Sequence, residues 1–384
     1  MKKRIICLAL IGIMLLAFLM PAKSADLELS APSAILMEAS TGQILYESNA
    51  DERLRPASVT KIMTLLLVME ALDDGRIGWD DTVTASAAAA AKGGSQIYME
   101  ENEQLSMDEM LKSVVVSSAN DCACALAEHI AGSESAFVEM MNTRAQELGM
   151  TNTHFVNCTG LDDEPNASEH LTTARDIAIM SRELLKHSAI KRYTTIWMDT
   201  VRNGQFGLSN TNKLVRFYDG TTGLKTGYTS SAGYCLSASA ERDGMELIAV
   251  VLHCAGSTDR FESAKAMLNY GFSNYALVEP DVANQIPAIP VKLGKSETVT
   301  PIPESTTPIL LSKSQAAKAE ISLETVEEVS APVEKGQQLG LVRISAEGST
   351  LAEIPLVCPQ EIQVLRFRDL WQMLLQVLCM KKSS

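Results

Sequence analysis

The fold of this chain is decided by the stretch Pro56-Ala57-Ser58-Val59-Thr60-Lys61-Ile62-Met63-Thr64-Leu65-Leu66-Leu67-Val68-Met69. From Ile62 onward its residues are apolar on nearly every face of a helix, which predicts a fully buried helix rather than an amphipathic one. Ser58 and Lys61 are three residues apart, so a helix would place them on one face at its start. This pair suggests a serine nucleophile beside a lysine base, although Ser-x-x-Lys is a common pattern and a serine here also suits a helix cap.

Two motifs further along the chain favour the catalytic interpretation. Ser118-Ala119-Asn120 is the only Ser-x-Asn in the sequence and lies between two predicted helical segments. Lys225-Thr226-Gly227 is the only Lys-Thr-Gly and begins a predicted pair of strands. The second Ser-x-x-Lys, Ser188-Ala189-Ile190-Lys191, has no such companions after it in that order, and we interpret it as the end of a surface helix.

The histidines do not suggest a Ser-His-Asp arrangement, but a lysine can replace the histidine as the base. A lysine accepts a proton only when it is uncharged, and its usual pKa is about 10.4. Burial or a neighbouring cation lowers that value. Lys61 adjoins the predicted buried helix and Lys225 would be the neighbouring cation, so we expect both effects to lower the pKa of Lys61.

The composition limits the class of protein. The chain has 384 residues, 46% of them apolar, which suggests two domains with sizeable cores. Its formal net charge is −14 and no segment forms a basic face, which argues against nucleic-acid binding. Of the eight cysteines, Cys7 falls in the N-terminal segment and the others lack framework spacing, so we expect buried free thiols. The five histidines lack metal-ligand spacing, so neither a metal site nor a cofactor is predicted.

Residues 1–24 have the pattern of a secretory signal peptide. Three basic residues follow Met1, an apolar run spans residues 5–20, and Ala22-Lys23-Ser24 offers small residues where a signal peptidase reads them. The apolar run is short for a retained membrane anchor, which is the alternative. We therefore expect export of the protein and cleavage after Ser24, or after Ala25.

The remaining sequence predicts an α+β catalytic domain at residues 25–276. A hairpin is expected at 33–47, with helices following it. Two strands joined at Asp243-Gly244 are expected at 233–241, where apolar and polar residues alternate, and at 246–254, where the run is apolar throughout, and a further helix follows them. This order predicts an antiparallel sheet with helices packed on it and an all-helical lobe. Short β-like runs separated by Gly and Pro predict a small β-rich domain at residues 277–360.

Residues 361–384 predict an amphipathic helix. From Ile362 to Met380, apolar side chains that include Phe367 and Trp371 fall on one helical face and polar side chains fall opposite, and the local charge is positive. This pattern favours a helix in the membrane interface, at the outer face of the cytoplasmic membrane, over a helix packed on its own domain.

The motifs of Ser58, Ser118 and Lys225, in this order, form the signature of penicillin-binding proteins and class A β-lactamases. The chain resembles one family in particular, the serine-type D-alanyl-D-alanine carboxypeptidases, which are low-molecular-mass penicillin-binding proteins. The resemblance is carried by Arg55–Thr64, Ser118–Asp121, Asn152–Phe155, Ala174–Asp176, Lys225–Thr229, Ala331–Gly336 and Pro355–Val357. It implies the penicillin-recognising transpeptidase or β-lactamase-like fold, an appended β-rich domain and a C-terminal amphipathic anchor.

By this resemblance the substrate is a peptidoglycan stem peptide that ends in D-Ala-D-Ala. Ser58 would attack the carbonyl of the penultimate D-Ala, Lys61 would take the hydroxyl proton, and Ser118 would help to pass a proton to the departing D-Ala. The backbone N–H groups of Ser58 and Tyr228 would form the oxyanion hole. Water would then hydrolyse the acyl-enzyme.

The resemblance also implies which residues bind the substrate. Asn120 would position the substrate amide and the base, and Lys225 would contribute positive potential. Thr226, with Gly227 beside it, would bind the terminal carboxylate. Arg260 matches a family arginine near that carboxylate, and the alternative for this residue is an ordinary surface arginine at a helix start.

Three other functions stay open on this sequence. A β-lactamase or a D,D-endopeptidase would share the fold, and a catalytically silent cell-wall-binding protein would keep the fold without the reaction. Glu164-Pro165-Asn166 superficially resembles the loop that carries the deacylating glutamate of class A β-lactamases, but the Leu-Asn pair expected downstream is absent. We therefore expect β-lactams to acylate Ser58 as inhibitors rather than to be hydrolysed quickly.

Overall fold

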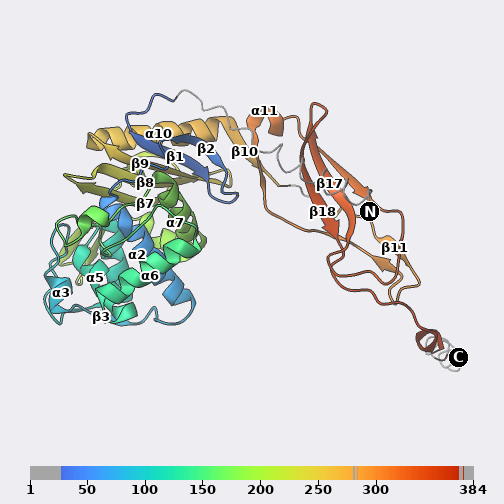
Figure 1. Ribbon diagram of the computed structural model, residues 1–384, viewed down its shortest axis with the longest axis horizontal. Coiled ribbons are helices and arrows are strands. Elements are labelled where there is room, and N and C mark those ends of the chain that lie inside the picture. The colour runs from blue at the N-terminus through green and yellow to red at the C-terminus, as the bar shows by residue number, and fades with distance from the viewer. Residues whose placement is uncertain (1–26, 280–281, 283, 372–374, 376–384) are drawn as a thin grey trace. The chain divides into compact units, whose positions relative to one another are not determined.

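The computed structural model describes residues 27–279, 282, 284–371 and 375 (Figure 1). The chain divides into two compact units, the first ending at Ser273 and the second beginning at Asn274. The predicted signal peptide and half of the predicted anchor segment, residues 372–374 and 376–384, lie outside the described residues.

The first unit is built on a five-stranded antiparallel sheet with strand order β2-β1-β9-β8-β7. These strands are β1 Ser33–Glu38, β2 Ile44–Ser48, β7 Thr221–Thr229, β8 Gly233–Arg242 and β9 Met245–Cys254. Asp243 and Gly244 join β8 to β9 with φ of 51° and 76°, the left-handed conformation that a tight hairpin turn requires. The Asp-Gly hairpin predicted from the sequence is therefore confirmed.

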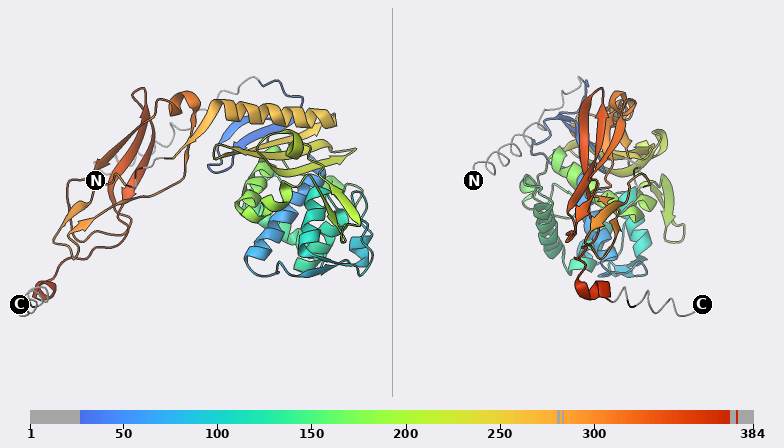
Figure 2. Two further views of the ribbon diagram at one scale, coloured as in Figure 1. Left: turned by 180° about the vertical axis from the view of Figure 1, so that it is seen from behind. Right: turned by 90° about the vertical axis from the view of Figure 1, so that its right-hand side faces the viewer.

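Helices cover both faces of this sheet (Figures 1 and 2). On one face lies α10 (Ser257–Asn274), so close that a Cβ on Gly271 would be 2.4 Å from Leu247 Cδ1. On the other lies α7 (Ala174–Lys186), where the hydroxyls of Ser181 and Ser237 are 2.8 Å apart. The alternating pattern expected at 233–241 is wrong, because β8 is buried without a break from Cys235 to Ala240.

A helical lobe packs below the sheet around α2 (Lys61–Asp73), which a 3₁₀ turn, η1 (Ala57–Thr60), precedes. Every residue of α2 from Lys61 to Met69 is buried, so the predicted buried helix is confirmed. Longer helices of the lobe are α4 Met107–Val116, α5 Asn120–Ala131 and α6 Glu134–Glu147. Shorter elements are β3 Thr82–Thr84, α3 Ala87–Ala90, β4 Gln104–Ser106, η2 Ala167–Glu169, η3 Ser188–Ile190, α8 Lys191–Thr194, β5 Met198–Val201, β6 Phe206–Ser209 and α9 Leu214–Phe217.

The second unit is β-rich, as the sequence predicts. Its sheets have the strand orders β13-β18-β17-β15, β12-β11-β16 and β10-β14. The strands are β10 Tyr275–Val278, β11 Ile289–Lys292, β12 Thr298–Val299, β13 Ile302–Pro303, β14 Ile309–Ser312, β15 Glu320–Thr325, β16 Val329–Ser330, β17 Gln338–Ala346 and β18 Ser349–Val357. The short helix α11, Lys313–Ala316, lies between β14 and β15.

The end of the chain departs from the predicted helix. Ile362 is 3% exposed, forms a β-bridge with Val333 and belongs to the core of the β-rich unit. Val364 forms a second bridge, and helical conformation begins only at Phe367. The predicted start of the helix at Ile362 is therefore wrong, because the first apolar residues of this segment belong to the core of the β-rich unit. Among the described residues, no helix combines the length and apolar character needed to cross a membrane.

Candidate active site

Ser58 and Lys61 come from the turn that opens α2. Ser58 lies in η1 and Lys61 is the first residue of α2. Lys61 Nζ lies 2.9 Å from Ser58 Oγ, and the lysine is fully buried. Neither η1 nor α2 has a side-chain cap, so Ser58 is not the helix cap that the pattern also allowed. The structure thus brings the predicted nucleophile and base into contact.

Burial sets the charge state of Lys61. Removal of the ammonium from water lowers its pKa from 10.5 to about 7, against weaker opposing attraction from Cys158 and Asp121. Lys61 Nζ also lies 2.9 Å from the carbonyl oxygen of Thr159, which accepts one of its N–H groups. An uncharged amine that donates to Thr159 keeps its lone pair for the proton of the Ser58 hydroxyl.

The carbonyl of Thr159 belongs to a tight loop, residues 157–161, whose importance could not be seen in the sequence. Asn157 Oδ1 accepts hydrogen bonds from the N–H groups of Thr159 and Gly160, at 3.2 and 2.7 Å, and holds the loop together. Gly160 has φ of +82°, and a Cβ there would lie 1.8 Å from the Ala57 carbonyl oxygen. The glycine therefore lets this loop lie against η1, where it presents the Thr159 carbonyl to Lys61.

Strand β7 packs its Lys-Thr-Gly segment against η1. A Cβ on Gly227 would lie 2.5 Å from the carbonyl oxygen of Pro56 and 3.1 Å from the backbone nitrogen of Ser58. Only glycine permits so close an approach between the two backbones. The next residue, Tyr228, is half-exposed, and its ring stacks on Tyr234 with 4.3 Å between centroids.

Lys225 is a second buried lysine, located on β7. Its Nζ donates to the carbonyl oxygen of Thr226 at 3.0 Å. Burial lowers the pKa of Lys225 well below its usual value, and the charges of Lys61 and Arg260 lower it further. We expected burial and the charge of Lys225 together to lower the pKa of Lys61. Burial is confirmed as the first cause at both lysines, whereas the repulsion between them lowers the pKa of Lys225. Because the two groups repel, protonation of one opposes protonation of the other.

The Ser-x-Asn segment forms the link between α4 and α5, with Ser118 in a left-handed conformation at φ of +63°. The backbone N–H of Asn120 donates to the Ser95 carbonyl and its Nδ2 donates to the Gly93 carbonyl, each at 2.7 Å. Asn120 Oδ1 is buried and has no hydrogen-bond partner among the described residues. An N–H group of a bound ligand would satisfy this oxygen.

Thr211, which the sequence analysis missed, connects this link to β7. Thr226 Oγ1 donates to Thr211 Oγ1 at 2.6 Å, and the backbone N–H of Thr211 donates to the Val116 carbonyl at 3.2 Å. Val116 is the last residue of α4, two positions before Ser118. Since Gly227 already contacts the turn of Ser58, all three motifs converge on one region of the structure.

Arg260 lies in the core and not on the surface. Its Nη1 donates to the Gly227 carbonyl oxygen at 3.0 Å, and its guanidinium lies over the rings of Phe261 and Tyr234. Arg260 Nε is buried and has no partner among the described residues. The interpretation as an ordinary surface arginine is therefore wrong.

The second Ser-x-x-Lys and the Glu-Pro-Asn segment each have their charged side chain in an ion pair away from Ser58. Lys191, from the second Ser-x-x-Lys, contacts the carboxylates of Glu241 and Glu246 at 2.9 and 3.0 Å. Glu164 is held by Lys92, with 2.6 Å between Nζ and the carboxylate. Because the Glu164 carboxylate is held in this ion pair, it is not free to act as a base that activates water.

The comparisons with known proteins agree with this geometry. A profile of the D-alanyl-D-alanine carboxypeptidase family, Peptidase S11, matches residues 20–256, and a profile of the penicillin-binding protein 5 C-terminal domain matches residues 275–364. The chain is 42% identical over 379 residues to D-alanyl-D-alanine carboxypeptidase DacF of Bacillus subtilis, which covers 95% of this chain and 96% of the relative. It is 32% identical over 371 residues to DacC of Escherichia coli, which covers 91% and 90% of the two chains.

Solved structures give the same result. Penicillin-binding protein 5 from Haemophilus influenzae matches with a TM-score of 0.76 and 30% identity, over 88% of this chain and 99% of that chain. Penicillin-binding protein D2 from Listeria monocytogenes, in its ampicillin-bound form, matches with a TM-score of 0.59 and 31% identity, over 65% of this chain and 100% of that chain. The chain therefore belongs to the D-alanyl-D-alanine carboxypeptidase family and is a serine hydrolase with the penicillin-binding protein fold.

Proposed function

We propose that this protein removes the terminal D-Ala from peptidoglycan stem peptides through an acyl-enzyme on Ser58, and that penicillin acylates the same serine. The observation that carries the proposal is the 2.9 Å contact between Ser58 Oγ and a buried lysine whose pKa is lowered to about 7. A lysine of ordinary pKa would be charged at neutral pH and could not act as a base.

The first step acylates the serine. Lys61 takes the proton of the Ser58 hydroxyl, and Ser58 Oγ forms a bond to the carbonyl carbon of the penultimate D-Ala. The backbone N–H groups of Ser58 and Tyr228 stabilise the oxyanion. The close packing of Gly227 on η1 supports this pairing, because β7 approaches the Ser58 nitrogen so closely that a Cβ on Gly227 would lie 3.1 Å from it.

The next steps release the products. The bond to the terminal D-Ala breaks, and Ser118 helps to carry the proton from Lys61 to the departing amine. Water then attacks the ester, releases the shortened peptide and restores Ser58. Asn120 positions the substrate amide during these steps, and its buried, unpaired Oδ1 supports that role.

Recognition of the terminal carboxylate is assigned to Thr226 and Arg260, and Lys225 supplies positive potential while Lys61 is uncharged and does not repel its charge. Arg260 bonds the backbone of Gly227 at 3.0 Å and therefore lies beside the strand that would hold the substrate. Its unpaired, buried Nε supports a position in which a carboxylate supplies the missing acceptor.

An endopeptidase activity is the second candidate. A D-alanyl-D-alanine endopeptidase of Pseudomonas aeruginosa is 30% identical over 243 residues and covers 62% of this chain. The ion pair of Glu164 with Lys92 speaks against rapid penicillin hydrolysis. The contact between Ser58 and Lys61 speaks against a silent cell-wall-binding protein, since binding alone needs no such pair.

We place the protein outside the cytoplasm, at the outer face of the cytoplasmic membrane. The residues 1–24 pattern supports export, and the sequence of the C-terminal tail supports attachment to the membrane interface. The exposed rings of Phe367 and Trp371, whose centroids are 6.5 Å apart, lie at the start of that tail.

The deciding experiment compares the wild type with Ser58→Ala. The wild type should release D-Ala from a diacetyl-Lys-D-Ala-D-Ala tripeptide and should be labelled covalently by a fluorescent penicillin, with slow turnover of benzylpenicillin. The variant should fold and show neither D-Ala release nor labelling. Labelling that persisted in Ser58→Ala would remove Ser58 as the nucleophile.

A further inference from the structure

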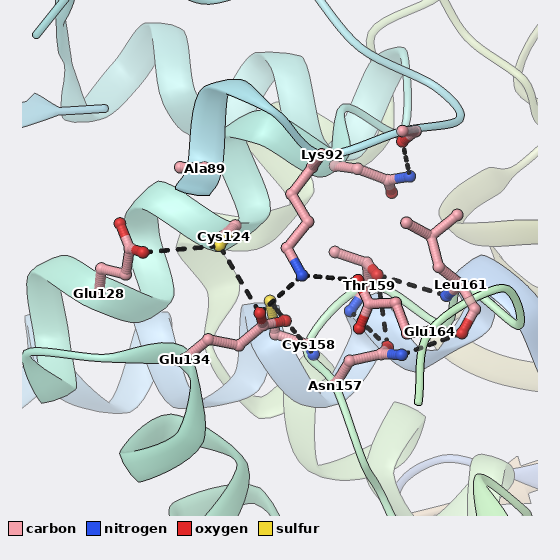
Figure 3. Close-up of polar contacts among 12 residues, drawn as sticks. Ala89, Lys92, Cys124, Glu128, Glu134, Asn157, Cys158, Thr159, Leu161 and Glu164 are labelled. Carbon is pink, nitrogen blue, oxygen red and sulfur yellow. Dashed lines mark hydrogen bonds and ion pairs between the residues drawn. The ribbon is translucent and has the colours of Figure 1, made fainter. Parts of the chain in front are cut away.

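Lys92 is a partly buried cation, with 13% of its side chain exposed, that lies close to the site but outside the three motifs. It lies just after α3, and its ammonium contacts Glu134 Oε2 and Glu164 Oε1, each at 2.6 Å (Figure 3). Burial alone would lower the pKa of Lys92, but its bonds to the two carboxylates raise it above the usual value. The ammonium is therefore charged, and it ties together three segments that are far apart in the sequence.

One of these connections leads to the base. Glu134 Oε1 accepts hydrogen bonds from the backbone N–H of Cys158 at 3.2 Å and from its thiol at 3.1 Å (Figure 3). The next residue is Thr159, whose carbonyl oxygen lies 2.9 Å from Lys61 Nζ. Glu134 therefore fixes the backbone one residue before the carbonyl that orients the amine of Lys61.

The other connection leads to the Ser-x-Asn segment. Lys92 is followed directly by Gly93, whose carbonyl accepts the Asn120 Nδ2 hydrogen bond at 2.7 Å. Gly94 has φ of +74°, and a Cβ there would lie 2.8 Å from the same Nδ2. The position of the Asn120 side chain thus depends on the loop that Lys92 begins.

The same cluster contains side chains that could bind a metal ion, but the ammonium of Lys92 takes the place of the cation. Ligand atoms of Cys124, Glu134 and Cys158 lie within 4.8 Å of one another. The neighbouring Cys124 thiol, burial and the Glu134 carboxylate raise the pKa of Cys158 well above its usual value. A protonated thiol donates to the carboxylate and is a poor metal ligand. The Lys92 ammonium supplies the positive charge that Glu134 needs.

We propose that Lys92 is a positioning residue that fixes the side chains of the base Lys61 and the substrate-binding Asn120 relative to each other. It acts through Glu134 and the 157–161 loop on one side, and through Gly93 on the other, without touching the substrate. The inference rests on the proposed roles of Lys61 and Asn120. No motif of the sequence analysis includes Lys92.

The test compares Lys92→Met with Lys92→Arg and with a matched control, Lys191→Met. Lys191 also bridges two glutamates, at 2.9 and 3.0 Å, but takes no part in the site. For Lys92→Met we expect kcat for D-Ala release to fall about tenfold or more, with a smaller change in KM. Lys92→Arg keeps the charge and should recover most of kcat, and Lys191→Met should resemble the wild type.

The pH profile separates positioning from a general loss of stability. Lys92→Met removes a positive charge and unmasks Glu134, and both changes favour protonated Lys61. The acid limb of kcat/KM should therefore move upward by about half a unit or more. In Lys92→Met with Glu134→Gln both charges are gone, so the limb should return towards the wild-type position while kcat stays low. All measurements are made well below the melting temperature of each variant.

The outcomes are distinct. Kinetics and pH profile of Lys92→Met equal to those of Lys191→Met would overturn the role of Lys92, as would a Lys92→Arg variant as slow as Lys92→Met. A wild-type enzyme that released no D-Ala would contradict the proposed function itself, which is a different result from normal wild-type activity with silent Lys92 variants.

Discussion

Lys61 is a basic side chain with no exposed surface, and among the described residues its amine contacts only a hydroxyl and a carbonyl at hydrogen-bonding distance. An ammonium in this environment loses its hydration without gaining a carboxylate partner at that distance, so the uncharged form is favoured. The chemistry of the site follows from this imbalance, because an uncharged amine beside Ser58 can accept its proton.

The residue scale gives the first prediction, for Lys61→Arg. Arginine stays protonated at any physiological pH, so it cannot accept the Ser58 proton. We expect D-Ala release and penicillin labelling to disappear while circular dichroism shows a folded protein. Lys191→Arg, at the second Ser-x-x-Lys, should keep wild-type rates. Substantial turnover by Lys61→Arg would remove Lys61 as the base.

Much of the candidate site could be predicted at this scale. The spacing of Ser58 and Lys61 predicts their contact, and three short motifs in order point to the family. Thr159, Thr211 and Lys92 could not be predicted, because each acts through a contact between segments that are remote in sequence. A carbonyl oxygen that orients a lysine carries no side-chain signal at all.

Two glycines determine how elements approach η1, and each gives a prediction at the scale of elements. A Cβ on Gly227 would clash with the Pro56 carbonyl at 2.5 Å, so Gly227→Ala should push β7 away from Ser58. We expect kcat/KM for acylation by penicillin to fall about tenfold or more. Gly207→Ala, in a strand where a Cβ meets nothing within 4 Å, is the control and should leave the rate unchanged.

Gly160→Ala tests the loop that presents the Thr159 carbonyl. The added Cβ would lie 1.8 Å from the Ala57 carbonyl, at a φ of +82°. Gly204 has nearly the same φ, +84°, but open space around it. We expect Gly204→Ala to lower the free energy of unfolding by about 1 kcal/mol and Gly160→Ala by about 3 kcal/mol or more, measured by urea denaturation. Equal losses would show that this close approach contributes nothing.

At the element scale, the sequence predicts helices and hairpins well, but it predicts less well which other elements pack against them. The Asp243-Gly244 turn and the buried helix α2 are found where local pattern places them. The continuous burial of β8 was missed, because a strand pattern does not tell which helices return to cover its second face. Ile362 was assigned to a helix for a similar reason, since its β-bridge partner, Val333, lies in another segment.

At the scale of the whole molecule, the chain combines a catalytic unit with a β-rich unit, and the predicted amphipathic tail comes last in the sequence. The bridges of Ile362 and Val364 and the hydrogen bond from the Leu365 N–H to the Leu293 carbonyl are the last described backbone pairings of this segment with the rest of the β-rich unit, so a truncation that tests the tail must begin after Leu365. A cut before Ile362 would remove a core residue that is 3% exposed and would damage the unit itself.

We predict that deletion of residues 366–384 moves the protein from the membrane fraction to the soluble fraction. The reason is the loss of the apolar face and positive charge that favour an interfacial helix. The truncated protein should keep its rate of penicillin labelling, because Ser58 belongs to the other unit. Continued sedimentation with membranes would contradict the attachment of the tail.

The pH dependence of Ser58 acylation by a penicillin tests the central claim most directly. Burial lowers the pKa of Lys61 from 10.5 to about 7, so the uncharged base forms as pH rises through that value. The second-order rate constant should therefore rise about tenfold per pH unit on the acid side and level off above about pH 7. A midpoint near the ordinary lysine pKa, or a rate that does not change across neutral pH, would contradict the account.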